Sequence, residues 1–281
     1  MTEFPLVYIV VLTWNGRADT LECLQSLRHL TYSNARILVV DNASEDGTAD
    51  AVRSSFPATE LIVNNSNLRF AQGNNAGIEY SLERGADYVL LLNNDTTVEP
   101  EFLTRLVEVA QNDRLVGIAG PKIYYYGHQK QIWSAGGKID WWRGWISHIG
   151  IREMDGDQYN TLREVDYITG CCMLVKRRVI DTVGTLDEKF YLYGEDVDWC
   201  IRARRAEFKV IYVPSSHIWH KVSASSDGHL SWFKNWNKLK SQLRLMARYA
   251  QWYHWSTIPV AMMFNVILSA GRALFRRNTT G

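Results

Sequence analysis

The stretch Tyr88-Val89-Leu90-Leu91-Leu92-Asn93-Asn94-Asp95-Thr96 decides the fold class of this chain. Its apolar run is too short to span a membrane, which is typical of a strand buried on both faces of a parallel sheet. Ligands bind at the carboxyl ends of such strands, so Asn93, Asn94 and Asp95 are candidates to hold a metal–phosphate or ribose group. The alternative is that they turn the chain and cap a helix near Pro100.

The residues before this strand alternate between strand and helix patterns. We expect strands over 6–13, 37–40 and 61–63, and helices over 19–30 (with Asp19 as its cap), 48–56 and 74–83. This alternation predicts a parallel sheet with right-handed crossovers, which would bring Thr13, Asp41 and Asp95 to one edge. No GxGxxG follows the first strand, so a divalent cation on Asp95 is the obvious group to neutralise a phosphate.

The second half of the sequence is richer in aromatic residues and glycine. Residues 120–165 predict turns and short antiparallel strands that form one wall of a cleft, and their rings either stack on a sugar or pack in the core. A strand is expected over 168–175, where Gly170 would allow the close approach of a ligand. A last short strand over 211–214 should lead into a loop carrying His217 and His220, either of which is a candidate metal ligand.

Acidic residues cluster at the start of a predicted helix near Glu195. Glu195 and Asp198 are three residues apart and share one helical face, whereas Asp196 points elsewhere. Acidic residues in a first helical turn are also favoured by the helix dipole alone. Their density favours chemistry, because a carboxylate aimed into a cleft can take a proton from an attacking hydroxyl.

Charge is distributed unevenly along the 281 residues. The net charge of +1 combines −7 over residues 1–227 with +8 over the remainder, where there is no acidic residue. The composition, 46% hydrophobic and 22% charged, is that of a folded soluble protein. The four cysteines lack metal-binding spacing and predict buried free thiols in a reducing compartment, and the N-terminus shows no export signal, so we expect a cytoplasmic protein.

The basic tail contains four tryptophans and an apolar segment over 258–271 that is short of the ~20 residues needed to cross a bilayer. This pattern predicts a helix lying on an anionic membrane surface, peripheral to the inner face of the cell membrane. The alternative is a helical pair that packs on the catalytic domain or on a second subunit of a homo-oligomer. Nucleic-acid binding is not expected, because no recognised motif accompanies the charge.

Four segments, in order, resemble the successive motifs of glycosyltransferase family 2, and the chain looks most like the bacterial rhamnosyltransferase branch. They are residues 39–48 (Val-Val-Asp-Asn-Ala-Ser-Glu-Asp-Gly-Thr), 70–77 (Phe-Ala-Gln-Gly-Asn-Asn-Ala-Gly), 92–96 (Leu-Asn-Asn-Asp-Thr) and 190–198 (Phe-Tyr-Leu-Tyr-Gly-Glu-Asp-Val-Asp). The resemblance covers about residues 6–225. It implies a GT-A fold, α/β with a mostly parallel central sheet, over residues 1–227, followed by a helical extension over 228–281. Residues to about 120 would bind the nucleotide and residues 121–227 the acceptor.

The resemblance also implies roles for individual residues. Asp41 would accept a hydrogen bond from the nucleotide base, and the donor pocket would also contain Thr13, Asn15, Asn75, Asn93 and Asn94. Asp95 would bind Mg²⁺ or Mn²⁺ at the donor diphosphate, with His220 as a further ligand. Asn93 stands where many relatives have aspartate, which makes the site less anionic. Asp196, beside Glu195, would be the general base.

The implied function is inverting transfer of a sugar from a nucleoside-diphosphate donor (dTDP or UDP, with rhamnose plausible) to an acceptor hydroxyl. The acceptor would be a glycan or a polyprenyl-diphosphate-linked sugar in cell-surface polysaccharide or glycolipid synthesis. One alternative is a sugar-nucleotide nucleotidyltransferase, which would want a glycine-rich basic loop after the first strand. Another is a non-catalytic carbohydrate-binding protein, which would have no need of Asp41, Asp95, Glu195 and Asp196.

Overall fold

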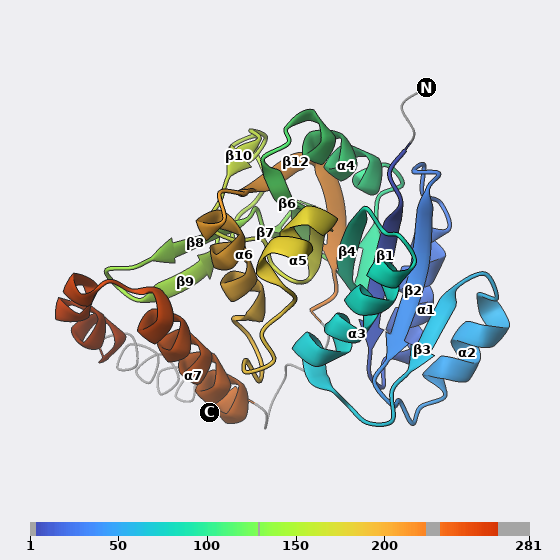
Figure 1. Cartoon of the computed structure of the whole chain (residues 1–281), viewed down its shortest axis with the longest axis horizontal. Coiled ribbons are helices and arrows are strands. Elements are labelled where there is room, and N and C mark those ends of the chain that lie inside the picture. Colours follow the sequence, from blue (N-terminus) through green and yellow to red (C-terminus); the bar gives the residue numbers. More distant parts are fainter. Residues whose placement is uncertain (1–3, 129, 223–230, 264–281) are drawn as a thin grey trace, which may run out of the picture.

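The computed structural model describes residues 4–128, 130–222 and 231–263, of which 231–235 are described by their backbone alone (Figure 1). The first half alternates strand and helix as predicted: β1 (Val7–Thr13), α1 (Arg17–Leu27), β2 (Ala35–Asp41), α2 (Thr48–Ser55), β3 (Glu60–Val63), α3 (Arg69–Glu83) and β4 (Tyr88–Asn93). It continues with β5 (Thr96–Val98), α4 (Phe102–Asn112), β6 (Val116–Tyr125), β7 (Ile132–Ser134), β8 (Gly137–Asp140), β9 (Trp145–His148) and β10 (Arg163–Glu164). The chain then forms β11 (Cys172–Lys176), α5 (Arg177–Val183), α6 (Glu195–Arg205), β12 (Lys209–His220), α7 (Ser231–Tyr249) and a 3₁₀ helix η2 (Trp252–Ser256).

The central sheet runs in the order β10-β12-β6-β11-β4-β1-β2-β3, with β5 on β12 and β7 on β6. The strands β4, β1, β2 and β3 are parallel, as the alternation of strand and helix predicts. Beyond β4 the sheet becomes mixed, because β11 is antiparallel to both β4 and β6. The smaller β8–β9 hairpin is antiparallel and projects from the body, in agreement with the short antiparallel strands expected in this region (Figure 1).

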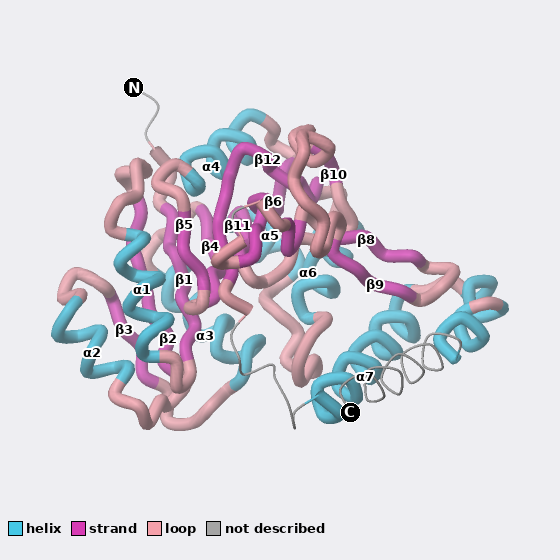
Figure 2. The backbone as a smooth tube through the Cα atoms, turned by 180° about the vertical axis from the view of Figure 1, so that it is seen from behind, coloured by secondary structure: helices cyan, strands magenta, loops and turns pink. Residues whose placement is uncertain are grey.

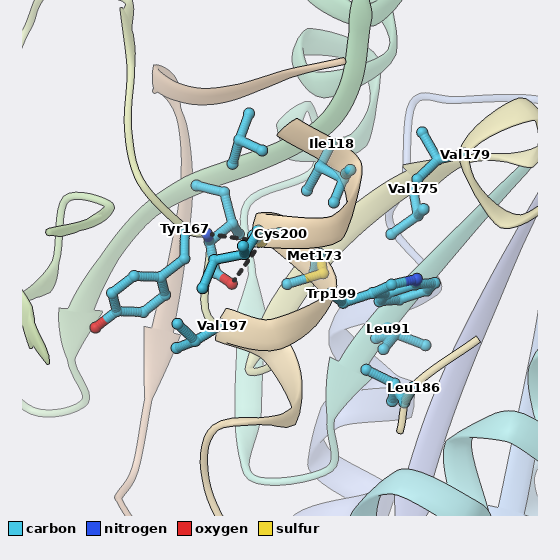
Figure 3. Packing of buried hydrophobic residues seen from close by; sticks show 14 of the residues in the cluster. Leu91, Ile118, Tyr167, Met173, Val175, Val179, Leu186, Val197, Trp199 and Cys200 are labelled. Carbon is cyan, nitrogen blue, oxygen red and sulfur yellow. Dashed lines mark hydrogen bonds between the residues drawn. The ribbon is translucent and has the colours of Figure 1, made fainter. Parts of the chain in front are cut away.

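Helices cover both faces of the sheet. Helices α3, α5 and α6 lie on one face, and α1, α2 and α4 lie on the other (Figures 1 and 2). The buried side chains of the two groups belong to two separate hydrophobic clusters. On the first face, Trp199 and Cys200 of α6 are fully buried against Met173 and Val175 of β11 (Figure 3). This packing fixes α6, and therefore the acidic residues at its start, against the middle of the sheet.

The predicted buried free thiols are confirmed. Cys23, Cys171, Cys172 and Cys200 are all buried and unbridged. Burial raises the pKa of each thiol, so none is a reactive thiolate at neutral pH.

The structure corrects three local expectations. Asp19 does not cap α1, which begins at Arg17 without a side-chain cap; it instead pairs with Lys221 Nζ at 2.7 Å. The helix expected over 74–83 begins earlier, at Arg69. The region after Pro214 is not a loop, because β12 continues to His220 through a register shift between Val213 and His217. Proline is tolerated at such an irregularity because no ladder hydrogen bond is required there.

The described part of the tail is helical, as expected, and packs on the body of the molecule. Ser241 donates a hydrogen bond of 3.0 Å to the Leu192 carbonyl, and Leu245 and Met246 are buried. No helix among residues 4–128, 130–222 and 231–263 is long and apolar enough to cross a membrane. Most of the apolar segment 258–271 lies outside the described residues.

Candidate active site

The sheet brings three of the predicted residues to one edge. Thr13 at the end of β1 is paired in register with Asp41 at the end of β2, and Leu12 is paired with Asn93 of β4. Asp95 lies two residues after Asn93, just beyond the end of β4. The carboxyl ends of these parallel strands therefore form a common edge, which is where sites form in open α/β sheets.

Asp41 has one buried carboxylate oxygen, Oδ2, that accepts no hydrogen bond from any described residue. Its side chain is fully buried; Oδ1 accepts a 2.7 Å hydrogen bond from the Ser44 N–H, and Oδ2 has no hydrogen-bond partner in the described part of the chain. Asn15 closes the neighbouring loop, since its Oδ1 accepts from the Glu45 N–H at 2.8 Å. A buried, unpaired carboxylate oxygen is costly unless a ligand donates to it, and the imide N–H of a uracil or thymine base is such a donor.

Three of the other predicted donor-site residues use their side chains to hold loops together. Thr13 Oγ1 lies 2.8 Å from Thr20 Oγ1, and the Asn94 amide donates to Thr20 Oγ1 at 3.1 Å. The Asn75 amide is engaged by the backbone of Leu186, donating at 2.9 Å and accepting at 3.0 Å. Asn93 donates its backbone N–H to the Cys171 carbonyl at 2.9 Å. Thr13, Asn75 and Asn94 thus shape the edge, and their direct contact with a donor stays a prediction.

Asp95 and His220 form a buried pair. His220 Nε2 lies 3.1 Å from Asp95 Oδ1, and both side chains are about one-tenth exposed or less. β5 pairs with the end of β12, opposing Thr96 to His220, and so brings the two residues together. His217 is three residues away on the same strand and therefore faces the other side, where its Nδ1 lies 3.2 Å from Glu99 Oε2.

This pair suits a divalent cation whose coordination shell is completed by oxygen atoms of a bound substrate. No group of three or more His, Cys, Asp or Glu side chains suited to a metal occurs among the described residues. A carboxylate and an imidazole supply two positions, and diphosphate oxygens are suitable for the remaining ones. The imidazole nitrogen of His220 favours Mn²⁺ over Mg²⁺, because Mg²⁺ prefers oxygen ligands.

Glu195 and Asp196 differ in their surroundings. Asp196 Oδ2 accepts from the Gly170 N–H at 2.9 Å and its Oδ1 from its neighbour Val197 at 2.8 Å, whereas Glu195 is buried and its Oε2 has no partner among the described residues. Burial, and then the charge of Asp196, raise the pKa of Glu195 to about 8. Burial also raises the pKa of Asp196, although backbone N–H donors oppose that rise. Glu195 therefore keeps its proton at neutral pH, and burial makes the Asp196 carboxylate a stronger base than an exposed aspartate.

Asp198 has a different task from its neighbours. It is completely buried and accepts hydrogen bonds from Arg202 Nε at 2.7 Å, Arg248 Nη1 at 2.6 Å and Tyr249 Oη at 2.6 Å. Arg248 also pairs with Asp187 at 2.8 Å. These bonds anchor α7 to the start of α6, so Asp198 is structural while Asp196 remains near the site.

The segment 170–172 connects the two acidic centres. The Gly170 N–H bonds to Asp196, and the Cys171 carbonyl accepts from Asn93. The charges of both Asp95 and Asp196 add to burial in raising the pKa of the Cys171 thiol, so both carboxylates lie near it. A Cβ at Gly170 would lie 2.8 Å from the Phe70 ring; this side chain, and not a ligand, makes the close approach for which glycine is needed.

Three ring side chains, Trp133, His148 and Tyr167, connect the Asp95–His220 pair with Asp196. Trp133 contacts His220 with ring centroids 4.5 Å apart, and His148 with centroids 4.6 Å apart. His148 Nδ1 lies 3.4 Å from Tyr167 Oη, and the pKa of Tyr167 is raised by burial and by the charge of Asp196. We call Trp133, His148 and Tyr167 the aromatic floor. Trp133 belongs to the aromatic-rich region 120–165 of the sequence, whereas nothing local marks His148 or Tyr167 as site residues.

The fold is that of the GT-A class of glycosyltransferases. Two solved structures share this fold: a mannosyltransferase from Pyrobaculum calidifontis in complex with GDP-Man and Mn²⁺ (TM-score 0.64, 16% identity, covering 97% of this chain and 81% of that one), and GalNAc-T7 with UDP, GalNAc and Mn²⁺ (TM-score 0.64, 15% identity, covering 78% and 44%). Residues 8–184 match the family model "Glycosyl transferase family 2". The chain belongs to glycosyltransferase family 2.

Curated relatives place it near the rhamnosyltransferases of that family. It is similar to N-acetylglucosaminyl-diphospho-decaprenol L-rhamnosyltransferase of Mycobacterium tuberculosis (26% identity over 239 residues, 78% of this chain and 76% of the relative). It is also similar to rhamnosyltransferase WbbL of Escherichia coli (23% over 255 residues, 86% and 93%) and to dTDP-rhamnosyl transferase RfbF of Shigella flexneri (25% over 227 residues, 78% and 70%). The family and branch predicted from the four motifs are confirmed.

Proposed function

We propose that this protein transfers a sugar, with inversion, from a dTDP- or UDP-linked donor to a hydroxyl group of a glycan or polyprenyl-diphosphate-linked acceptor. Rhamnose is the leading candidate sugar, because the relatives above carry that name. The observation that carries the proposal is the position of the Asp95–His220 pair and Asp196 near one tripeptide, residues 170–172. A site for a leaving diphosphate and a base for an incoming hydroxyl would then adjoin one reaction centre.

Each residue has a task in this proposal. Asp41 Oδ2 accepts the imide N–H of the base, which uracil and thymine both offer. Asp95 and His220 would hold Mg²⁺ or Mn²⁺, which would offset the negative charge that develops on the diphosphate. Asp196 takes the proton of the acceptor hydroxyl. At the same time the hydroxyl oxygen bonds to the anomeric carbon from the face opposite the diphosphate. The bond from that carbon to the phosphate oxygen breaks, and its electron pair leaves with the nucleoside diphosphate.

A panel of nucleotide sugars with Mn²⁺ tests the proposal. We expect nucleoside diphosphate to be released from one dTDP- or UDP-sugar when acceptor is present, and NMR of the product to show an inverted anomeric centre. Release of inorganic pyrophosphate from a nucleoside triphosphate and a sugar 1-phosphate would instead identify a nucleotidyltransferase. Sugar binding without turnover of any donor would support the carbohydrate-binding alternative.

We further propose that residues 1–227 act as the catalytic domain and that the tail holds the enzyme to an anionic membrane from the cytoplasmic side. Large side chains of η2 and of the hairpin turn are exposed; Trp252 is 84% exposed and Trp142 53%. Tryptophans beside basic residues suit the headgroup layer of a bilayer. Sedimentation with phosphatidylglycerol vesicles at low salt tests this. Trp252→Ser should lower the bound fraction and Leu115→Ser, also exposed, should not; a full-length chain that stays in the supernatant contradicts membrane attachment.

A further inference from the structure

Helix α7 and the β8–β9 hairpin lie beside each other at the end of the molecule that is farthest from β1–β3 (Figures 1 and 2). The Gln242 side chain donates a hydrogen bond to the Gly144 carbonyl in the hairpin turn. A Cβ on Gly144 would lie 3.5 Å from Met246, so Met246 of α7 also reaches this turn. Residues four apart in a helix share a face. Lys238, one turn before Gln242, therefore projects toward the hairpin as well.

The other end of the hairpin carries His148, which is part of the aromatic floor. In the β8–β9 register His148 is paired with Gly137, at the opposite end from the turn. Burial lowers the pKa of His148 to about 4, and the positive charge of Lys238 contributes to this, which places the ammonium group near the ring. At neutral pH His148 is therefore uncharged, and the cation beside it is Lys238.

Lys238 has no anionic partner in the described part of the chain. No ion pair involves it there, and burial alone lowers the pKa of its ammonium group, with no carboxylate to oppose the effect. Its side chain nevertheless remains open to solvent. A ligand can therefore reach the Lys238 ammonium group from solvent.

The other cations of α7 whose side chains the structure describes contact other groups. Arg248 is engaged by Asp187 and Asp198, Arg244 lies over the Phe190 ring at 5.5 Å, and Lys240 lies over the Trp236 ring at 5.2 Å. Because an unpaired, partly desolvated ammonium is electrostatically unfavourable, an anion bound there would stabilise it.

We propose that the surface between Lys238 and His148 is the acceptor subsite and that Lys238 binds the phosphate groups of the acceptor. This inference rests on the proposed function and selects, from the two acceptors proposed there, the polyprenyl-diphosphate-linked one. The aromatic floor connects this surface with both Asp196 and the Asp95–His220 pair. The donor diphosphate belongs at Asp95 and His220, on the other side of Trp133, so the two phosphate sites are separate.

The direct test is calorimetric binding of geranyl diphosphate to the full chain saturated with UDP and Mn²⁺, which occupy the donor site. Lys238→Met keeps the apolar stem and removes the charge. We expect it to weaken geranyl diphosphate binding at least tenfold, with the affinity for UDP within twofold of wild type. Lys240→Met, two residues along the same helix, is the matched control and should change neither affinity.

Any one of four results overturns the inference. Geranyl diphosphate could fail to bind the wild type, or bind Lys238→Met as tightly as the wild type. Lys238→Met could weaken UDP instead, which would assign the ammonium to the donor. It could also lower binding to phosphatidylglycerol vesicles while leaving geranyl diphosphate unaffected, which would assign it to lipid headgroups.

Kinetics separate this inference from the proposed function. With a working donor and acceptor, Lys238→Met should raise KM for the acceptor at least tenfold and leave KM for the donor unchanged. If no donor supports transfer but Lys238 is required for geranyl diphosphate binding, the subsite stands and the proposed function fails. If transfer occurs and the acceptor KM of Lys238→Met equals that of the wild type, the proposed function stands and the subsite is wrong.

Discussion

The carboxylate of Asp196 accepts a 2.9 Å hydrogen bond from the backbone N–H of Gly170. This bond joins the start of α6 to the segment that leads into β11, the neighbour of β4 in the sheet. The proposed base is therefore held in place by the backbone at the edge of the sheet.

Asp196→Asn should abolish the proposed proton transfer without disturbing the donor pocket. An amide cannot take the proton but can still accept from Gly170, so we expect the fold to be kept and kcat to fall about 10²–10⁴-fold. The Kd for UDP or dTDP, measured by calorimetry with Mn²⁺, should stay within about twofold. A kcat within a few fold of the wild type would remove Asp196 from this role.

His220→Ala and His217→Ala form a matched pair from one strand. His220 pairs with Asp95, whereas His217 pairs with Glu99 on the other face of the strand. We expect His220→Ala to weaken Mn²⁺ binding in the presence of UDP by about tenfold or more, as measured by electron paramagnetic resonance, because a ligand is lost. His217→Ala should bind Mn²⁺ as the wild type does. The reverse pattern would assign the metal to His217.

Asp41→Asn tests recognition of the base. Replacing a charged acceptor by a neutral amide should weaken a bond worth about 1.5–3 kcal/mol, so we expect the Kd for dTDP and UDP to rise about tenfold or more. Asp50→Asn is a suitable control, because Asp50 is exposed on α2 and pairs only with Arg53 among the described residues. Equal affinities in Asp41→Asn and the wild type would show that Oδ2 does not contact the nucleotide.

Glu195 should make stability fall as pH rises. Its pKa is about 8 in the folded protein and 4.5 when the side chain is exposed to water, so between these values the folded state holds a proton that the unfolded state has lost. The free energy of unfolding should therefore decrease by up to about 1.4 kcal/mol per pH unit from this group, and level off above pH 8.

Urea unfolding at several pH values between 5 and 8 checks this. Glu195→Gln cannot ionise, so the variant should lose less stability than the wild type over the same range. Parallel pH curves for the two proteins would mean that the pKa of Glu195 is not raised.

Tyr249→Phe tests the anchoring of α7. The Tyr249 hydroxyl donates at 2.6 Å to the buried carboxylate of Asp198, and removing a hydrogen bond to a charged group costs about 1.5–3 kcal/mol. We expect that loss in the free energy of unfolding measured with urea. Tyr253→Phe, in the exposed η2 helix, should change it by less than about 0.5 kcal/mol. Similar values for both variants would show that the Asp198 bond contributes little.

The sequence by itself determined the alternation of strands and helices in the first half, and with it the common edge formed by Thr13, Asp41 and Asp95. This was possible because apolar periodicity is local and because parallel strands joined by right-handed crossovers leave few possible topologies. The four motifs also identified the family. The continuation of β12 beyond Pro214 was missed, since proline and serine locally favour a loop and only pairing with β5 and β6 overrides that preference.

Only the tertiary structure decided which side chains are available for chemistry. Asp196 and Asp198 have the same side chain and lie two residues apart, yet contacts with Gly170 in one case and with α7 in the other separate a candidate base from an anchor. The choice of His220 over His217 beside Asp95, the bracing role of Asn75 and the proximity of Lys238 to His148 likewise depend on segments far apart in the chain. Periodicity fixes which face a residue occupies, but what lies opposite that face is set by packing between distant elements.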